Sequence, residues 1–155
     1  CVATDSPDSN ERLLRQELLQ NRAAAARFIG MADAGANGLD ALGEKIAAIP
    51  RPFSAVVLGM GGDGHTASWF PQAENLTALL DPANPADVAL TDPVTAAHRR
   101  LTLTLAAVLD SREIVLHITG EAKRALLENA RARSYPVAAV LEQKLSPVSI
   151  WWAPG

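Results

Sequence analysis

Apolar residues along the chain fall into short runs and into longer segments with helical spacing, and the two kinds of segment alternate. The unbroken or regularly alternating runs, which are typical of strands, cover 54–58, 88–91, 99–105, 113–119 and 148–152. The segments whose spacing or short length between turns predicts helices cover 8–20, 39–48, 76–80, 106–109, 121–131 and 136–141. Strands that alternate with helices predict an α/β domain with a mainly parallel sheet.

Polar residues mark the start of the first helix. Asp8 is the predicted N-cap, because a glutamate follows it three residues later as in a capping box. Ser9 and Asn10 have two interpretations, contact with a substrate and helix capping, and capping is the more common role of such residues. Further on, 26–31 is either a short strand or a continuation of the helix, and the Asn-Gly dipeptide at 37–38 predicts a turn.

The most informative stretch runs from Val56 to Pro71. Val56–Leu58 is apolar without alternation, which predicts a parallel strand covered on both faces. Four glycines lie within the next six residues, 59–64, and they allow the backbone to turn sharply and to approach a ligand. Residues 64–70 then predict a short helix that ends at Pro71. Since open α/β folds place their chemistry at the carboxyl ends of parallel strands, this loop is the expected reaction centre.

The same loop also fits the G-x-G-x-x-G dinucleotide fingerprint, because it follows a strand and precedes a predicted helix. Two features argue against that interpretation. The predicted helix has barely two turns before Pro71, which is too short for an ordinary crossover between parallel strands. Asp63 would also place a negative charge where a pyrophosphate must sit. A dinucleotide site is therefore disfavoured.

His65 is the candidate general base. Its ordinary pKa lies close to neutral pH, where an imidazole can accept a proton from water. Asp63, two residues earlier, is predicted to hold the ring in one tautomer and to stabilise the imidazolium. The alternative role of Asp63 is to cap the predicted helix over 64–70. Both roles are compatible with each other.

Glycine amides and nearby hydroxyls complete the candidate reaction centre. The backbone amides of Gly61, Gly62 and Gly64 are not shielded by side chains, so they are candidate donors to an oxyanion. The alternative is that these glycines only form a tight turn. The hydroxyls of Thr66 and Ser68 are expected to make local helix contacts.

Composition excludes several classes of protein. The 155 residues carry a net charge of −3, so no basic surface predicts nucleic-acid binding. No apolar run approaches the length of a membrane span, and a single cysteine is compatible with the cytoplasm. His98 and His117 lack the spacing of a metal site, and His117 is expected to be a core histidine within a strand. We expect no metal and no cofactor.

The segment Gly59–Pro71 resembles the G-M-G-x-D-G-H-T-A-S-x-F-P signature of the 6-phosphogluconolactonases, which share a superfamily with the glucosamine-6-phosphate deaminases. The resemblance continues over nearly the whole chain, from 5–10 to 150–154. It implies an open, mainly parallel twisted sheet with helices on both faces, of Rossmann-like type. It also implies that residues 1–155 form the C-terminal two-thirds of a longer single domain, whose earlier part would carry a phosphate-binding loop.

The resemblance also assigns the substrate phosphate to two cations. Arg100 stands where relatives have the arginine of an Arg-Ile-Thr/Ser-Leu-Thr segment, and Lys123 stands in the strand-Gly-x-x-Lys turn. A planar guanidinium together with a mobile ammonium suits a dianion. The alternative is that both are solvated surface charges. Arg99 is adjacent, so which of the two arginines faces the site stays open.

The function that the resemblance implies is hydrolysis of 6-phospho-D-glucono-1,5-lactone, with His65 activating water. A deaminase and isomerase of amino-sugar phosphates is the alternative within the superfamily. Those relatives have a Phe-Asn-Glu-Pro segment after the histidine, whereas Phe70 occupies the position of the carboxylate here. A non-catalytic sugar-phosphate-binding protein is the third hypothesis. In each of them the partner is a small sugar phosphate.

Overall fold

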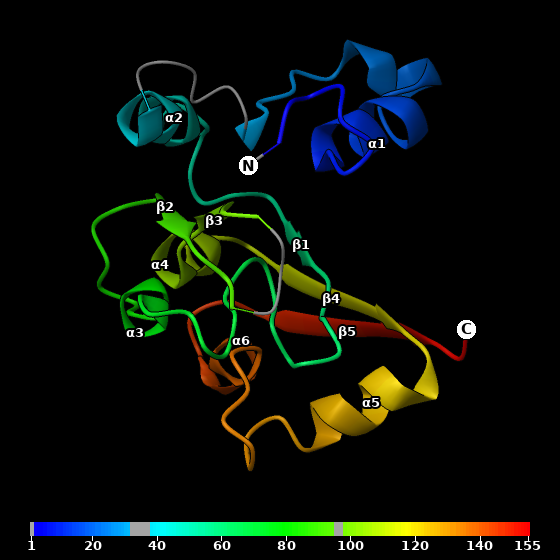
Figure 1. Cartoon of the computed structure of the whole chain (residues 1–155), viewed down its shortest axis with the longest axis vertical. Coiled ribbons are helices and arrows are strands. Elements are labelled where there is room, and N and C mark those ends of the chain that lie inside the picture. Colours follow the sequence, from blue (N-terminus) through cyan, green and yellow to red (C-terminus); the bar gives the residue numbers. More distant parts are fainter. Residues whose placement is uncertain (1, 32–37, 95–97) are drawn as a thin grey trace.

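The computed structural model describes residues 2–31, 38–94 and 98–155, and its central feature is a parallel sheet (Figure 1). The sheet contains β1 (Val56–Leu58), β4 (Ile114–Thr119) and β5 (Val148–Ala153) in the order β1-β4-β5. Both neighbouring pairs are parallel. The predicted mainly parallel α/β architecture is therefore confirmed. The predicted turn at 37–38 falls partly on residue 37, which lies outside the described residues.

A second sheet consists of two antiparallel strands, β2 (Val88–Thr91) and β3 (Arg100–Leu103). Both strands were expected from the sequence, although β3 is shorter than the alternating stretch. The register places Thr91 opposite Arg100 and Val88 opposite Leu103. This pair brings the start of β3 toward the glycine loop.

The described helices agree with most of the predicted segments, although those near 8–20, 76–80, 121–131 and 136–141 are shorter than predicted. They are α1 (Asn10–Glu17), α2 (Gly38–Ala47), α3 (Leu76–Leu79), α4 (Leu105–Leu109), α5 (Glu121–Glu128) and α6 (Ala138–Glu142), with a 3-10 helix, η1, at Asn21–Ala25. None of these helices is both long enough and apolar enough to cross a membrane, within the part of the chain that is described.

The first helix corrects two predictions. Ser9, not Asp8, is the N-cap of α1, because its hydroxyl accepts a hydrogen bond from the amide of Arg12 at 3.3 Å. The segment 26–31 is neither a strand nor a continuation of α1. Asn21 has a φ of 52°, in the left-handed region, so the backbone leaves the α1 direction before the alanines form η1.

The main core lies on one face of the parallel sheet. Val56, Leu58, Ile114, Leu116 and Ile118 are buried there against α4 and α6. Side chains of α5 complete this packing, since Leu126 and Leu127 are half-buried against the core. A smaller core joins α2 to β2.

The opposite face of the parallel sheet is open among the described residues. Val57 is 69% exposed and Trp151 is 61% exposed, and His117 between them is also exposed. The prediction that Val56–Leu58 is covered on both faces is therefore wrong, as is the prediction of a core histidine at 117. Alternate residues of a strand point to opposite faces, and the described helices pack against only one of them.

Candidate functional site

The glycine loop after β1 holds the candidate reaction centre, and it contains no helix. Residues 61–69 form turns and one isolated bridge between Thr66 and Trp69. The predicted helix over 64–70 is wrong because two residues have left-handed backbones, Gly64 with a φ of 79° and Ala67 with a φ of 49°. Right-handed helical turns cannot propagate through such residues.

Side chains fasten this loop to both sheets. Thr66 is fully buried, and its hydroxyl donates to the carbonyl of Gly59 at 2.7 Å, which closes the loop on the end of β1. Trp69 is also fully buried, and its indole donates to the carbonyl of Leu103 in β3 at 2.9 Å. Thr66 thus does make a local contact, as expected, but to a loop rather than to a helix. The loop is anchored at both ends.

His65 and Asp63 form a close pair within this loop. Asp63 Oδ1 lies 2.5 Å from His65 Nδ1 and accepts a second hydrogen bond from the His65 amide at 3.2 Å. The His65 side chain is 29% exposed and the Asp63 side chain is 34% exposed, so both remain accessible to a small molecule. The Phe70 ring lies 4.4 Å from the imidazole, measured between centroids. Asp63 therefore caps no helix, and it orients the ring instead.

The charge state of Asp63 follows from these contacts. Burial raises the pKa of Asp63, but hydrogen bonds from the His65 amide and ring, with attraction to the imidazolium, outweigh burial. The pKa of Asp63 consequently lies below its ordinary value. The carboxylate is ionised at neutral pH and can stabilise a proton taken up by the ring.

The glycines of the loop have different roles. A Cβ at Gly61 would collide with the His65 ring, and one at Gly64 would collide with Tyr135, whereas at Gly62 it would meet open space. The amides of Gly61 and Gly64 already donate to the carbonyls of His65 and Gly61, at 2.9 and 3.1 Å. Of the three amides predicted as oxyanion donors, only that of Gly62 has no acceptor among the described residues. The Gly62 amide therefore remains the candidate donor.

The arginine pair at the start of β3 has a clear orientation. Arg99 forms a bidentate hydrogen-bonded ion pair with Asp92, and both N–O distances are 2.9 Å. Arg100 points to the glycine loop, and its Nε is buried with no hydrogen-bond partner among the described residues. Two residues later, the Thr102 hydroxyl accepts from the Ser68 amide at 3.2 Å, which fixes β3 against the loop. Arg100 is thus the arginine that faces the site.

These residues converge on one open cleft of about 470 Å³. Four of the predicted site residues line it: Gly62, Asp63, His65 and Arg100. Three others do not. Gly61 lies against the His65 ring, Gly64 lies against Tyr135, and Lys123 lies half-buried in the first turn of α5.

Four further residues line the cleft, and the linear sequence carries only a partial signal for them: Asn10, Ala67, Ser68 and Phe70. From the sequence, helix capping is the more common role for Asn10, and a local helix contact is expected for Ser68. Ser9 indeed caps α1, and this cap leaves the adjacent Asn10 at the cleft wall. A separate hollow of about 350 Å³ shares Asn10, Ser68 and Arg100 with the cleft. Ser9 caps the helix and the adjacent Asn10 lines the cleft, and a linear motif does not show which of two neighbouring residues has which role.

No group of three or more histidine, cysteine, aspartate or glutamate side chains with metal-site geometry occurs among residues 2–31, 38–94 and 98–155. The chemistry that the cleft can perform with its own residues is proton transfer by His65, supported by an ionised carboxylate and by a cation. A base, a donor and an anion-binding group within one cleft suit the hydrolysis of an activated carbonyl compound that carries an anionic tail.

Comparison with known proteins agrees with this chemistry. The family described as glucosamine-6-phosphate isomerases/6-phosphogluconolactonase matches residues 1–151. A 6-phosphogluconolactonase of Mesorhizobium japonicum is 44% identical over 158 aligned residues, and one of Rhizobium meliloti is 38% identical over 160. Each alignment covers 99% of this chain. The crystal structure of a 6-phosphogluconolactonase from Shewanella baltica superimposes with a TM-score of 0.88 at 44% identity, over 97% of this chain.

The chain spans about two thirds of the length of these relatives. The alignments cover 66% of the Mesorhizobium protein, 69% of the Rhizobium protein and 67% of the Shewanella structure. The matched part includes the glycine loop, β3 and all of the cleft residues described above.

Proposed function

The chain belongs to the glucosamine-6-phosphate isomerase/6-phosphogluconolactonase family, and on this premise we propose that it hydrolyses 6-phospho-D-glucono-1,5-lactone to 6-phospho-D-gluconate, a step of the oxidative pentose phosphate pathway. The observation that carries the proposal is the pair of Asp63 and His65 in an open cleft that Arg100 also lines. A lactone carbonyl is already electrophilic, so a base and donors to its oxygen are sufficient.

In the proposed reaction His65 removes a proton from water through Nε2, because Nδ1 faces Asp63. The resulting hydroxide attacks the lactone carbonyl carbon, and the carbonyl oxygen becomes an oxyanion. The free amide of Gly62 is the proposed donor to that oxygen. When the oxyanion collapses, the bond from the carbonyl carbon to the ring oxygen breaks. The imidazolium then returns its proton to that oxygen, which becomes a hydroxyl.

The substrate phosphate is proposed to bind Arg100. A buried guanidinium nitrogen without a partner favours an incoming anion, because an unpaired buried polar group is costly. Lys123 is the proposed second cation. It follows β4, which is parallel to β1, so the turn that carries it and the glycine loop lie at the same end of the sheet. Binding the remote phosphate would orient the carbonyl toward His65.

Nothing in this reaction needs a cofactor or a metal, and the proposal includes neither. The substrate is a phosphorylated metabolite, so we place the reaction in the cytoplasm, with which the single cysteine is compatible.

The decisive assay tests one substrate for each of the two activities in the family. The full-length protein is incubated with freshly prepared 6-phosphogluconolactone and, separately, with glucosamine 6-phosphate. We expect lactone opening well above the spontaneous rate and no release of ammonia, because Phe70 stands beside His65 where a deaminase carboxylate would be needed. Ammonia release, or lactone opening only at the spontaneous rate, would reject the proposal.

A further inference from the structure

Two adjacent residues of the glycine loop are hydrogen-bonded to two adjacent residues of β3. The Ser68 amide donates to the Thr102 hydroxyl at 3.2 Å, and that hydroxyl donates in turn to the Leu103 carbonyl at 3.0 Å. The Trp69 indole donates to the same carbonyl at 2.9 Å. Because each pair of residues is joined by the chain, these contacts close on themselves and form a hydrogen-bond cycle between the loop and the strand.

The hydrogen-bond cycle is shielded from water. Thr102 is 2% exposed and Trp69 is fully buried. A threonine hydroxyl can donate and accept at the same time, and the Thr102 side chain does both here. Valine has a similar shape but no hydroxyl. Replacing Thr102 by valine would therefore leave the Ser68 amide without its acceptor, which is costly away from water.

The backbone beside the cycle has an unfavourable conformation. Ala67 lies two residues after His65 and directly before Ser68, and its φ of 49° is in the left-handed region. Such a backbone persists only where the surrounding contacts enforce it. The cycle supplies these contacts on one side of Ala67, and the bond from Thr66 to the end of β1 supplies them on the other. The path of the segment that carries His65 therefore depends on β3.

The same strand carries the cation proposed to bind the substrate phosphate. Arg100 precedes Thr102 by two residues in β3, so both side chains point to the same face of the strand. That face meets the glycine loop, because Thr102 contacts Ser68 and Arg100 lines the cleft. Pairing with β2, where Thr91 lies opposite Arg100, fixes the start of β3. The hydrogen-bond cycle thus sets the spacing between Arg100 and His65.

We propose, on the basis of the proposed function, that Thr102 is a positioning residue that matches this spacing to the distance between the phosphate and the carbonyl carbon of the substrate. A lactone held by its phosphate at Arg100 presents its carbonyl to His65 only if the two side chains keep one separation. An unphosphorylated lactone is not held by Arg100, so its approach to His65 does not depend on that separation. Thr102 therefore contributes to the preference for a phosphorylated substrate, although it does not line the cleft.

The test compares Thr102→Val with Thr104→Val in the full-length protein. Thr104 is the matched control because it is also buried and its hydroxyl also makes two hydrogen bonds, but to the Ala86 carbonyl and the Ala107 amide. We expect Thr102→Val to lower kcat/KM for 6-phosphogluconolactone at least about 10-fold, and for an unphosphorylated lactone by less than about twofold. Thr104→Val should change neither value. Thr102→Ser keeps the hydroxyl and should stay near the wild type with both lactones.

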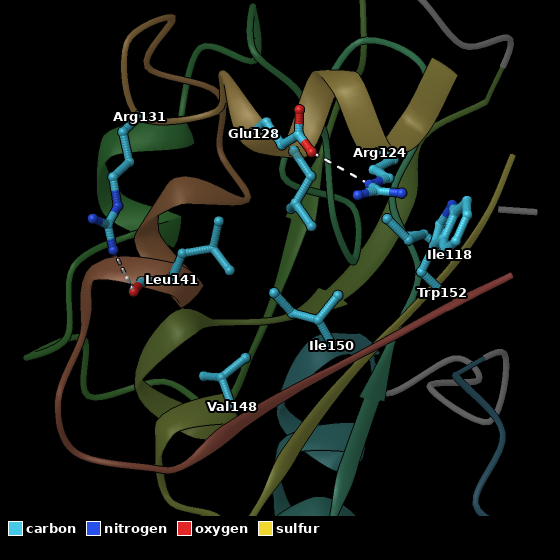
Figure 2. A pocket seen from close by; sticks show the side chains of 9 residues that line it. Ile118, Arg124, Glu128, Arg131, Leu141, Val148, Ile150 and Trp152 are labelled. Carbon is cyan, nitrogen blue, oxygen red and sulfur yellow. Dashed lines mark hydrogen bonds and ion pairs between the residues drawn. The ribbon is translucent and has the colours of Figure 1, made fainter. Parts of the chain in front are cut away.

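A remote variant separates positioning from a general loss of stability. Ile118 in β4 is 2% exposed and lines a hollow of about 550 Å³ beside α5 and α6 (Figure 2), which shares no lining residue with the cleft. Ile118→Val should destabilise the protein, because it removes a buried methylene, without changing kcat/KM for either lactone. If Thr102→Val does not fold, Trp69→Phe replaces it. That variant removes the donor to Leu103, keeps a buried aromatic ring, and should show the same selective loss.

A loss confined to the phosphorylated lactone supports the role of Thr102. Equal losses with both lactones would make Thr102 a structural residue, and an unchanged kcat/KM for the phosphorylated lactone would show that the spacing does not depend on it. Either result overturns the inference while the wild-type protein still opens the lactone. A wild-type protein that opens the lactone only at the spontaneous rate would reject the proposed function, and the role of Thr102 with it.

Discussion

Two regions meet at the cleft, and they are held in opposite ways. The glycine loop buries Thr66 and Trp69 completely and is fastened by their hydrogen bonds to β1 and β3. Helix α1 brings Asn10 to the same cleft but buries no residue of its own, and its Leu13 is 57% exposed. The loop can therefore hold the site residues in a precise geometry, because side-chain hydrogen bonds fix its backbone. The position of α1, in contrast, depends on the N-cap of that helix.

The largest expected effect is on the loop anchor. Trp69→Ala removes a fully buried indole and its bond to Leu103, so the free energy of unfolding should fall by about 4 kcal/mol. Leu14→Ala in α1, where the leucine is 37% exposed, is the matched control and should change stability by less than about 0.5 kcal/mol. Urea unfolding measures both. Similar losses would show that the two regions do not differ as described.

The next effect concerns the two arginines of β3. Arg100→Ala should lower kcat/KM for the phosphorylated lactone by about 100-fold, or about 3 kcal/mol, because the half-buried guanidinium no longer meets the phosphate. Arg99→Ala should have little effect, since Arg99 binds Asp92. An unphosphorylated lactone should be insensitive to both changes. An equal loss with both lactones would assign Arg100 a structural role.

Asp63→Asn should have a smaller effect on activity. It removes a charged hydrogen bond to the imidazolium, so kcat should fall by about 30-fold, or about 2 kcal/mol. Because the pKa of Asp63 is lowered in the folded protein, its contribution to stability is present above the ordinary carboxyl pKa. That contribution is lost as pH falls through the lowered value. Acid titration of stability should therefore be less steep in the variant.

The smallest effect is expected at the α1 cap. Ser9→Ala leaves the Arg12 amide without its acceptor, and the free energy of unfolding should fall by about 1 kcal/mol. Because Asn10 follows Ser9 directly, KM for the lactone should rise while kcat stays near the wild-type value. Ser9→Asp restores a capping side chain and should recover both quantities. A fall in kcat with Ser9→Ala would mean that α1 contributes to the reacting geometry itself.

The strands and the cleft were accessible from the sequence to different degrees. Unbroken or regularly spaced apolar runs located β1, β4 and β5, because such runs are typical of strands in parallel sheets. The same runs could not show that Val57 is exposed, since that depends on which face the helices cover. His117 was misjudged for the same reason: an apolar strand context does not tell which side of the sheet a residue faces.

His65, Asp63 and Arg100 are predicted as site residues from the sequence, and all three line the cleft, but the backbone predicted for the loop is wrong. A helix was predicted because Pro71 follows a segment without breakers other than glycine. The observed loop depends on the left-handed backbone of Ala67 and on the distant partners of Trp69 and Ser68 in β3. Such contacts link residues more than thirty positions apart, so no local pattern contains them.

The account depends most directly on His65 as the base. The measurement is the initial rate of 6-phosphogluconolactone hydrolysis by the full-length protein and by His65→Ala, with circular dichroism to verify that both are folded. We predict a fall in kcat of about 10²- to 10⁴-fold in the variant, toward the spontaneous rate. A folded His65→Ala variant that retains wild-type kcat would contradict the account.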